Sequence, residues 1–199
     1  RRKCRVTPVL SNAEGRRQPD RRTEASGVPL VSLAPVVILA CGNPSRGDDA
    51  LGPILLDRLQ IWLETAGCAG LADDFELITD FQLQVEHALD LVGRRLALFI
   101  DAGQQTPAPF VFRRAQAIDS ASPSTHSLPP ESVLAVLPRI SREAPPPAFI
   151  LCVRGERFEL GEGLSPVATR HAHAAFELLN ELCRAADVGA WQARVSGGE

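Results

Sequence analysis

The sequence predicts an α/β fold with three layers, in which a mostly parallel, twisted sheet is flanked by helices on both faces. Two observations predict it. From residue 36 onward, short apolar runs alternate with longer segments in which apolar residues recur at helical spacing. The apolar runs are nearly continuous, as is typical of strands that are buried on both faces of a parallel sheet.

The first half of this region contains three predicted strands and two predicted helices. Residues 36–41 are six apolar residues in a row, which is long enough for one fully buried strand. Helical spacing of apolar residues predicts a helix over residues 49–66. A short strand is predicted over 75–79, a helix over 85–92, and a strongly apolar strand over 96–100.

The second half completes the alternation. An edge strand is predicted over residues 110–114, after a loop rich in glycine, glutamine and proline. A short helix over 131–140 and an apolar strand over 148–153 follow. The last helix is predicted over 167–186, preceded by a serine and a proline that suit the start of a helix.

Length and composition fit one domain. The chain has 199 residues, enough for a substantial core. With 45% hydrophobic residues, 23% charged residues and a net charge of −3, it has no general attraction to nucleic acid or to a membrane. No apolar run reaches the length of a membrane-spanning helix. We expect a monomer without nucleic-acid or membrane partners.

The five cysteines indicate a reducing compartment. They are odd in number and widely spaced, and they form no C-x-x-C motif. Cys41 and Cys152 lie in strand-like apolar runs, where they are expected to be buried thiols. We therefore expect a cytoplasmic protein.

The two ends of the chain differ from its middle. Residues 1–34 are rich in arginine, and their apolar residues show no periodicity. We expect this segment to be a disordered basic extension, or a stretch included ahead of the true start. Residues 35–188 are expected to form the single α/β domain, and residues 189–199 a flexible tail.

Two consecutive carboxylates, Asp48 and Asp49, follow the first predicted strand. One aspartate at this place is explained as a helix cap, because the unpaired N–H groups of a first turn favour a carboxylate. A single cap does not explain two acids in a row. The joint between strand and helix lies at the carboxyl edge of an open α/β sheet, where ligands bind, so Asp49 is also a candidate ligand-binding residue.

Asp101 and His126 are the other candidates. Asp101 follows the third predicted strand, and His126 lies in a loop rich in serine and proline. Right-handed crossovers would bring these loops to the edge that carries Asp49. Two carboxylates and an imidazole suit nickel, zinc or a similar divalent ion, with open positions for a substrate. Each has a simpler interpretation, since Asp101 can merely end a strand and His126 can be a solvated loop histidine.

The common hydrolase motifs are absent from the sequence. It contains no G-x-S-x-G elbow and no H-E-x-x-H zinc motif. A serine hydrolase of the usual type and a zincin are therefore not expected.

Four motifs occur in order along the chain. They are G-N-P-S-R-G-D-D-A-L-G-P from Gly42, L-F-I-D-A-G around Asp101, S-T-H-S-L around His126, and G-E-G-L-S-P-V before the last helix. Together they resemble the [NiFe]-hydrogenase maturation endopeptidases, over nearly all of residues 36–186. The resemblance implies a twisted, parallel-type sheet between helices. It also implies removal of a short C-terminal extension from the hydrogenase large subunit once nickel has been inserted.

The resemblance also implies a metal site. Matched by motif, the residues that contact the metal would be Asp49, Asp101 and His126, the same three that the topology selects. The nickel would be supplied by the substrate, and zinc or another divalent ion could replace it. The family more often has glutamate at the place of Asp49, so the metal should lie closer to this backbone. Whether the metal polarises the scissile carbonyl or activates a water stays open.

One stretch departs from the family pattern. Many members read D-G-G-T after the second strand, whereas here Asp80 is followed by Phe81 and Gln82. This resembles the branch that processes soluble, NAD-linked bidirectional hydrogenases. Asp80, together with Gly42 and Asn43 of the turn, is a candidate for substrate recognition.

The expected function is a metal-dependent endopeptidase whose partner is the precursor of the large subunit of a [NiFe]-hydrogenase. One alternative is a non-catalytic, nickel-dependent checkpoint that binds the same precursor. Another is an unrelated peptidase or hydrolase on a similar scaffold, which would cleave whether or not its substrate holds nickel.

Overall fold

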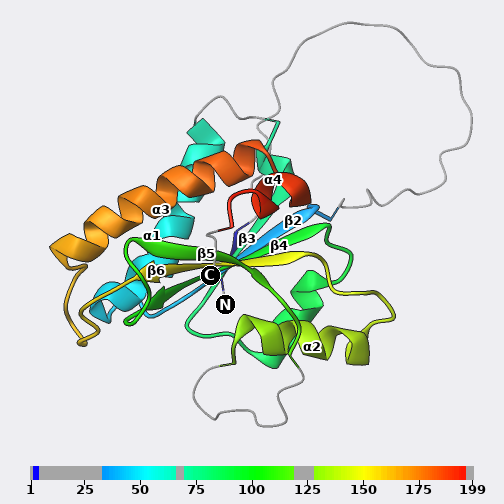
Figure 1. Cartoon of the computed structure of the whole chain (residues 1–199), viewed down its shortest axis with the longest axis horizontal. Coiled ribbons are helices and arrows are strands. Elements are labelled where there is room, and N and C mark those ends of the chain that lie inside the picture. The colour runs from blue at the N-terminus through cyan, green and yellow to red at the C-terminus, as the bar shows by residue number, and fades with distance from the viewer. Residues whose placement is uncertain (1, 5–32, 66–69, 119–127, 196–199) are drawn as a thin grey trace, which may run out of the picture.

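A twisted sheet runs through the molecule (Figure 1). The computed structural model describes residues 2–4, 33–65, 70–118 and 128–195. Within these residues the sheet has six strands in the order β1-β3-β2-β4-β6-β5. The strands are β1 (Arg2–Cys4), β2 (Val36–Cys41), β3 (Phe75–Asp80), β4 (Leu96–Gly103), β5 (Phe110–Ala115) and β6 (Ala148–Arg154). The four inner strands are parallel, and the edge strands β1 and β5 pair antiparallel, which confirms the predicted mostly parallel sheet.

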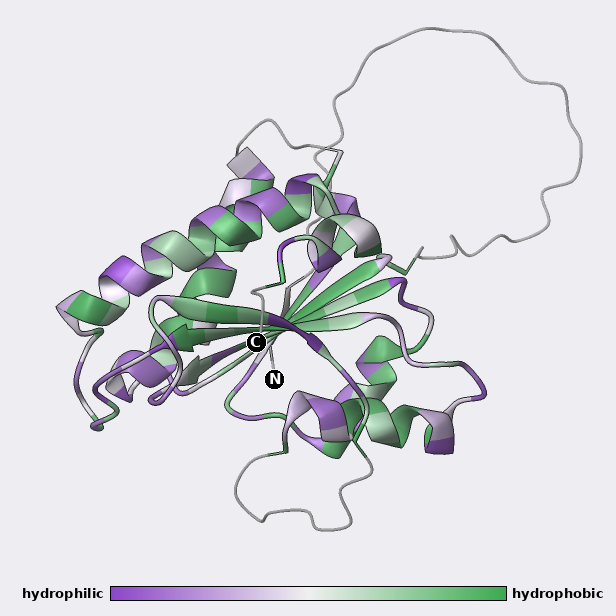
Figure 2. Cartoon of the chain, in the orientation of Figure 1, coloured by the Kyte–Doolittle hydropathy of each residue, from purple (hydrophilic) through white to green (hydrophobic). Residues whose placement is uncertain are grey.

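Helices cover both faces of the sheet, which confirms the three layers (Figure 1). The long helices α1 (Leu51–Thr65) and α3 (Pro166–Arg184) pack on one face. Helix α2 (Pro130–Ile140) and the 3-10 helix η3 (Val85–Leu91) cover the other. Figure 2 shows the strands as mostly hydrophobic, while α1 and α3 alternate between hydrophobic and hydrophilic residues. In the described part of the chain, no helix combines the length and apolar character needed to cross a bilayer.

Successive side chains of a strand point to opposite faces of the sheet, and this explains the two hydrophobic cores. In β2, Val36, Ile38 and Ala40 join the core under α1 and α3, while Val37 and Leu39 join the core under α2. All six residues of the strand are buried. A strand covered on both faces must be apolar throughout, and this is why the run of six apolar residues was a reliable signal.

Two predicted helices have a different geometry. The helix expected from residue 49 begins at Leu51, and the preceding turn, Gly47–Ala50, is the 3-10 helix η1. The helix expected over residues 85–92 is also 3-10. Side chains also hold both segments, since the buried Asp48 accepts from the N–H of Glu156 and Nδ1 of His87 accepts from the N–H of Gln84 at the start of the second.

The predicted flexible tail is wrong for its first part. Residues Val188–Gln192 form helix α4, and Trp191 has no exposed surface. Its indole N–H donates to the Leu182 carbonyl at 2.9 Å, and its ring packs edge-on against Phe112 and Phe149. Burial of Trp191 in this aromatic cluster therefore fixes residues 188–192 against the core. At the other end, residues 2–4 form a strand rather than a disordered extension, while residues 1 and 5–32 lie outside the described residues.

Candidate active site

The carboxyl ends of the parallel strands carry a row of polar side chains. Cys41 of β2 pairs with Asp80 of β3, and Asp101 of β4 pairs with Cys152 of β6. Strands β2 and β4 are in register up to the residues just before Cys41 and Asp101, so these two are level as well. Alternate residues share a face, and all four continue the face that packs on α2. The register therefore places two acids and two thiols in one row at the edge of the sheet.

A tight turn after β2 positions Asp49. Gly42 has a φ of 142°, and a Cβ at this position would overlap the carbonyl oxygen of Asp49. The backbone N–H of Asn43 donates to Asp49 Oδ2 at 3.0 Å, and the Asn43 side chain accepts from the N–H of Ser45 at 2.9 Å. Gly42 and Asn43 thus shape the turn that holds the carboxylate. Their part in recognising a substrate stays a prediction.

Asp48, in contrast, points into the protein and has no exposed surface. Its Oδ2 accepts from the backbone N–H groups of Glu156 at 2.7 Å and Arg157 at 2.9 Å. Ser165 donates twice, from its N–H to Oδ1 at 2.7 Å and from its hydroxyl to Oδ2 at 2.9 Å. The same hydroxyl accepts from Ala168 and caps α3. Asp48 therefore joins the turn before α1 to the loop before α3.

The hydrogen bonds to Asp48 decide its charge. Burial by itself would raise its pKa. The three N–H donors and the Ser165 hydroxyl outweigh this and hold the pKa below its ordinary value. The donors come from the loop before α3, so the expectation of a simple cap for the first helix does not describe this residue. Asp48 is a saturated structural carboxylate.

Asp101 has the opposite environment. The residue is exposed on one side, yet the protein around its carboxylate removes enough water to raise the pKa to about 6. The N–H of Ala102 donates to Oδ1 at 2.8 Å and opposes this rise, while the negative charge of Asp49 adds to it. Within the described residues, no lysine or arginine pairs with either acid. The two carboxylates thus form a negative site without a basic partner.

The thiol of Cys41 marks the centre of this charge. Burial raises its pKa, and the charges of Asp101, Asp80 and Asp49 each raise it further. Three acids therefore surround one buried sulfur. The thiol stays protonated and unreactive.

Asp80 takes part in local structure. Its Oδ1 accepts from the N–H of Phe81 at 2.7 Å, and its Oδ2 lies 3.5 Å from Nε2 of His87. His87 is 1% exposed, and its Nδ1 accepts from the N–H of Gln84 at 2.8 Å, which assigns the ring proton to the nitrogen that faces Asp80. Asp80 thus fixes the loop after β3, and its proposed role in recognition stays a prediction.

His126 lies outside the described residues, so its position next to Asp49 and Asp101 stays a prediction. Among the residues that the structure does describe, no group of three His, Cys, Asp or Glu side chains could hold a metal ion. The fold therefore brings two of the three predicted ligands to one edge of the sheet. Carboxylates without a basic partner suit a divalent cation, whose charge would relieve their repulsion.

Sequence reasoning missed Cys152 and Thr106 as neighbours of the site. Thr106 Oγ1 lies 2.9 Å from Cys152 Sγ, and Cys152 pairs with Asp101. Burial raises the pKa of the Cys152 thiol. The rule that selected Asp101, a polar residue at the carboxyl end of a parallel strand, also applies to Cys152, because both strands end at the same edge.

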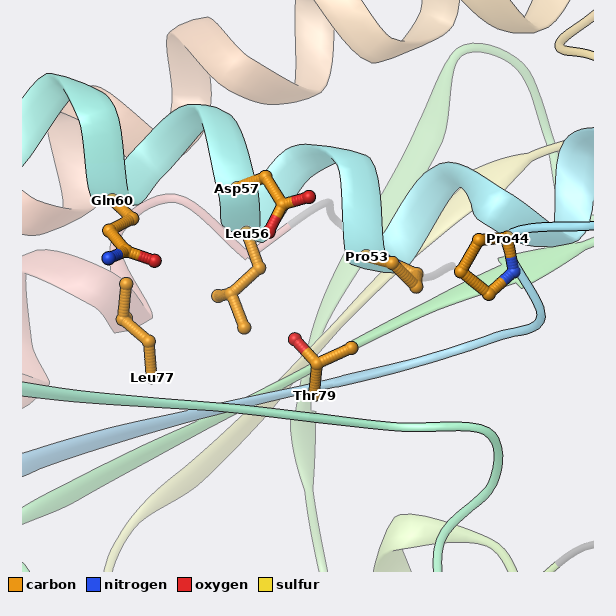
Figure 3. A pocket seen from close by; sticks show the side chains of 7 residues that line it. All are labelled: Pro44, Pro53, Leu56, Asp57, Gln60, Leu77 and Thr79. Atoms are coloured by element: carbon orange, nitrogen blue, oxygen red, sulfur yellow. The ribbon is translucent and has the colours of Figure 1, made fainter. Parts of the chain in front are cut away.

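Two hollows open on opposite faces of the sheet. A cavity of about 320 Å³ lies on the α2 face and is lined by Asp101, Cys152 and residues from β5 and the start of α2. A groove of about 200 Å³ lies on the other face between α1 and β3, where Leu56, Gln60 and Thr79 point into it (Figure 3). Of the two, only the cavity includes a predicted site residue.

Solved structures share this fold. The chain is similar to the hydrogenase maturating endopeptidase HybD from E. coli, with a TM-score of 0.58 and 21% identity over 76% of this chain and 93% of that one. The fold is that of the hydrogenase maturation proteases. The [NiFe] hydrogenase maturation protease HycI from Thermococcus kodakarensis gives a TM-score of 0.54 and 23% identity, over the same 76% and 93%. An endopeptidase from Escherichia coli gives 0.56 and 24%, over 77% and 94%.

No protein-family model and no curated protein matches the sequence. The likeness to maturation proteases is thus one of fold, and at these identities it leaves the chemistry to be argued from the residues. In this fold, the turn after β2 and the end of β4 present Asp49 and Asp101 at one edge. Such a pair can bind a cation and hold a substrate beside it.

Proposed function

We propose that this protein is an endopeptidase that removes the C-terminal extension from the precursor of a [NiFe]-hydrogenase large subunit. The fold of the maturation proteases supports the proposal, as does the order of the four motifs along the chain. One observation carries the most weight. Asp49 and Asp101, both matched by motif, lie close enough at the carboxyl edge for the charge of one to raise the pKa of the other.

In this proposal nickel arrives as part of the substrate, and Asp49, Asp101 and His126 bind it. The bound metal would polarise the scissile carbonyl or activate a water. The protein supplies position, because the N–H of Asn43 holds Asp49 and the backbone of β4 holds Asp101. Asp101 has a pKa of about 6 and must lose its proton to bind a cation, whose charge favours that loss. Zinc or another divalent ion would take the same ligands.

The finer details of the proposal follow from single features. Phe81 and Gln82 in place of two glycines support the branch that serves soluble, NAD-linked bidirectional hydrogenases. The free thiols of Cys41 and Cys152 suit a reducing cytoplasm. One copy of the chain contains all three proposed ligands, so the proposal requires only a monomer.

The decisive experiment incubates the purified protein with a nickel-loaded large-subunit precursor and follows its mass by electrophoresis and mass spectrometry. We expect loss of the C-terminal extension with wild type, and no cleavage with Asp101→Asn or His126→Ala. The matched control is Asp73→Asn, which removes an exposed carboxylate outside the site and should leave cleavage unchanged.

The alternatives give different results in the same assay. Tight binding of the nickel-loaded precursor without cleavage would replace the peptidase with a checkpoint protein. Equal cleavage of nickel-loaded and nickel-free precursor would indicate an unrelated peptidase. Cleavage by Asp101→Asn at the wild-type rate would end the proposal.

A further inference from the structure

We propose that the cavity beside Asp101 is a specificity subsite, which receives an uncharged, apolar side chain flanking the bond that is cleaved. The inference rests on the proposed function, and it adds which part of the chain selects the substrate. It assigns this role to Val111 and Ile150 in the cavity wall.

The cavity lies directly beside Asp101. Asp101 is part of its lining, and Cys152, which pairs with Asp101, is another part. Val111 pairs in turn with Cys152 across β5 and β6. Adjacent strands lie about 4.8 Å apart, and one residue of extended peptide spans about 3.5 Å. A bond held at Asp101 therefore has its neighbouring side chains within reach of the cavity.

Much of the lining of the cavity is apolar. Val111 and Ile150 line the cavity from strands β5 and β6, and Pro107, Pro129 and Pro130 also line it. Pro130 begins α2, so part of the lining is fixed to a helix. Prolines have a fixed φ, and strand residues are held by their ladder, so the cavity exists before a ligand arrives.

Three charged side chains line the cavity, Asp101, Arg113 and Glu131. Arg113 Nη1 lies 2.7 Å from Oε1 of Glu131, whose side chain is 8% exposed, so these two charges neutralise each other. The hydroxyl of Thr106 and the thiol of Cys152 form a hydrogen bond with each other. Asp101 is the remaining charge in the lining, and the proposed function commits it to the metal. A charged side chain, whether aspartate or lysine, would therefore lose water in this cavity without gaining a free partner.

The volume of the cavity limits the size of the side chain that it can hold. A cavity of about 320 Å³ has room for roughly ten waters at about 30 Å³ each. This is enough for a large aliphatic or aromatic side chain. Apolar walls, a neutralised ion pair and this size together favour a residue such as leucine over glycine, aspartate or lysine.

The test uses a set of precursors in which each residue flanking the cleaved bond is changed in turn to glycine, leucine, phenylalanine, aspartate or lysine. At one of the two positions we expect wild type to prefer leucine to glycine by roughly 10-fold or more in kcat/KM, with aspartate and lysine the poorest. Val111→Phe places a ring in the cavity, so the preference should fall to 1 or reverse while the glycine substrate is still cleaved. Val111→Ala enlarges the cavity and is the second variant, to be used if Val111→Phe does not fold. It should weaken the preference for leucine over glycine and improve cleavage of a substrate with an aromatic residue at that position.

The matched control is Gln60→Phe, which adds the same ring to the groove on the other face of the sheet (Figure 3). It should leave the leucine-to-glycine ratio unchanged. If wild type cleaves but the ratio is the same in both Val111 variants, the cavity inference is overturned and the proposed function stands. A ratio that changes only in Gln60→Phe would move the subsite to the groove and also overturn it. If wild type cleaves no precursor, the proposed function fails first and the inference with it.

Discussion

Two regions that meet in the turn after β2 show how differently the fold uses the same side chain. Asp48 is sealed from solvent and accepts four hydrogen bonds, three from backbone N–H groups and one from a hydroxyl. Its neighbour Asp49 is half-buried and, among the described residues, its carboxylate accepts one hydrogen bond, from the N–H of Asn43, while it faces the charge of Asp101. The oxygens of Asp48 are therefore satisfied by the protein, whereas Asp49 keeps accepting capacity beside a second negative charge.

The difference separates an acid that serves stability from two acids that remain candidates for chemistry. Hydrogen bonds hold the pKa of Asp48 low, because the donors favour the ionised form. Desolvation and a neighbouring negative charge raise the pKa of Asp101 to about 6. A carboxylate whose oxygens are satisfied by the protein has nothing left for a ligand. One that is crowded and unpaired is the better candidate for function.

The largest effect should appear when the unpaired acids are neutralised. Asp49→Asn and Asp101→Asn should each lower cleavage of nickel-loaded precursor by roughly 100-fold or more, because a charged ligand becomes a neutral one. The melting temperature should hold or rise slightly, since repulsion between the acids is relieved. The paired measurements are kcat/KM and a thermal melt. A large loss of stability would show that these acids are structural like Asp48.

The second effect concerns the saturated acid. Asp48→Ala should lower the free energy of unfolding by about 3 kcal/mol or more, because buried N–H groups of Glu156, Arg157 and Ser165 lose their acceptor. Urea unfolding measures it, with Asp73→Ala as the control at an exposed aspartate. A midpoint equal to that of wild type would contradict the anchoring role.

The two acids should also respond to pH in opposite directions. The folded pKa of Asp101 is raised from 3.8 to about 6, so its contribution to stability is present at low pH and lost as the pH rises through about 6. The folded pKa of Asp48 is lowered, so its contribution is present above the ordinary value and lost as the pH falls through the folded pKa. Urea midpoints between pH 3 and 7, without metal, should show a decline near pH 4 to 6 that Asp101→Asn removes. Identical profiles for variant and wild type would refute the raised pKa.

The smallest effect is expected at Asn43. Replacing it by alanine removes the acceptor for the Ser45 N–H in an exposed turn, which should cost about 0.5–1 kcal/mol of stability. The backbone N–H to Asp49 remains, so cleavage should fall only a few-fold. Asn43→Asp keeps an acceptor and should restore most of the loss. A loss as large as that of Asp49→Asn would instead give the Asn43 side chain a direct role with the substrate.

Much of the fold was predictable because its signals are local. The strand predicted over residues 36–41 was observed with the same bounds, and the other predicted strands agree closely at their starts. A strand that is buried on both faces must be apolar along its length, and neighbouring residues alone reveal this. β4 runs past Asp101 to Gly103, because its pairing with β6 continues there, and no local pattern records a partner strand.

The sequence by itself determined the alternation of strands and helices and the place of Asp49 and Asp101 at the carboxyl edge of the sheet, and it selected three residues for testing. Only the tertiary structure separated Asp48 from Asp49, because the donors that claim Asp48 lie more than a hundred positions away along the chain. It also placed Trp191 in the core, where its ring packs edge-on against the stacked rings of Phe112 and Phe149. Hydrogen-bond partners and packing partners are set by proximity in space, and a linear pattern carries neither.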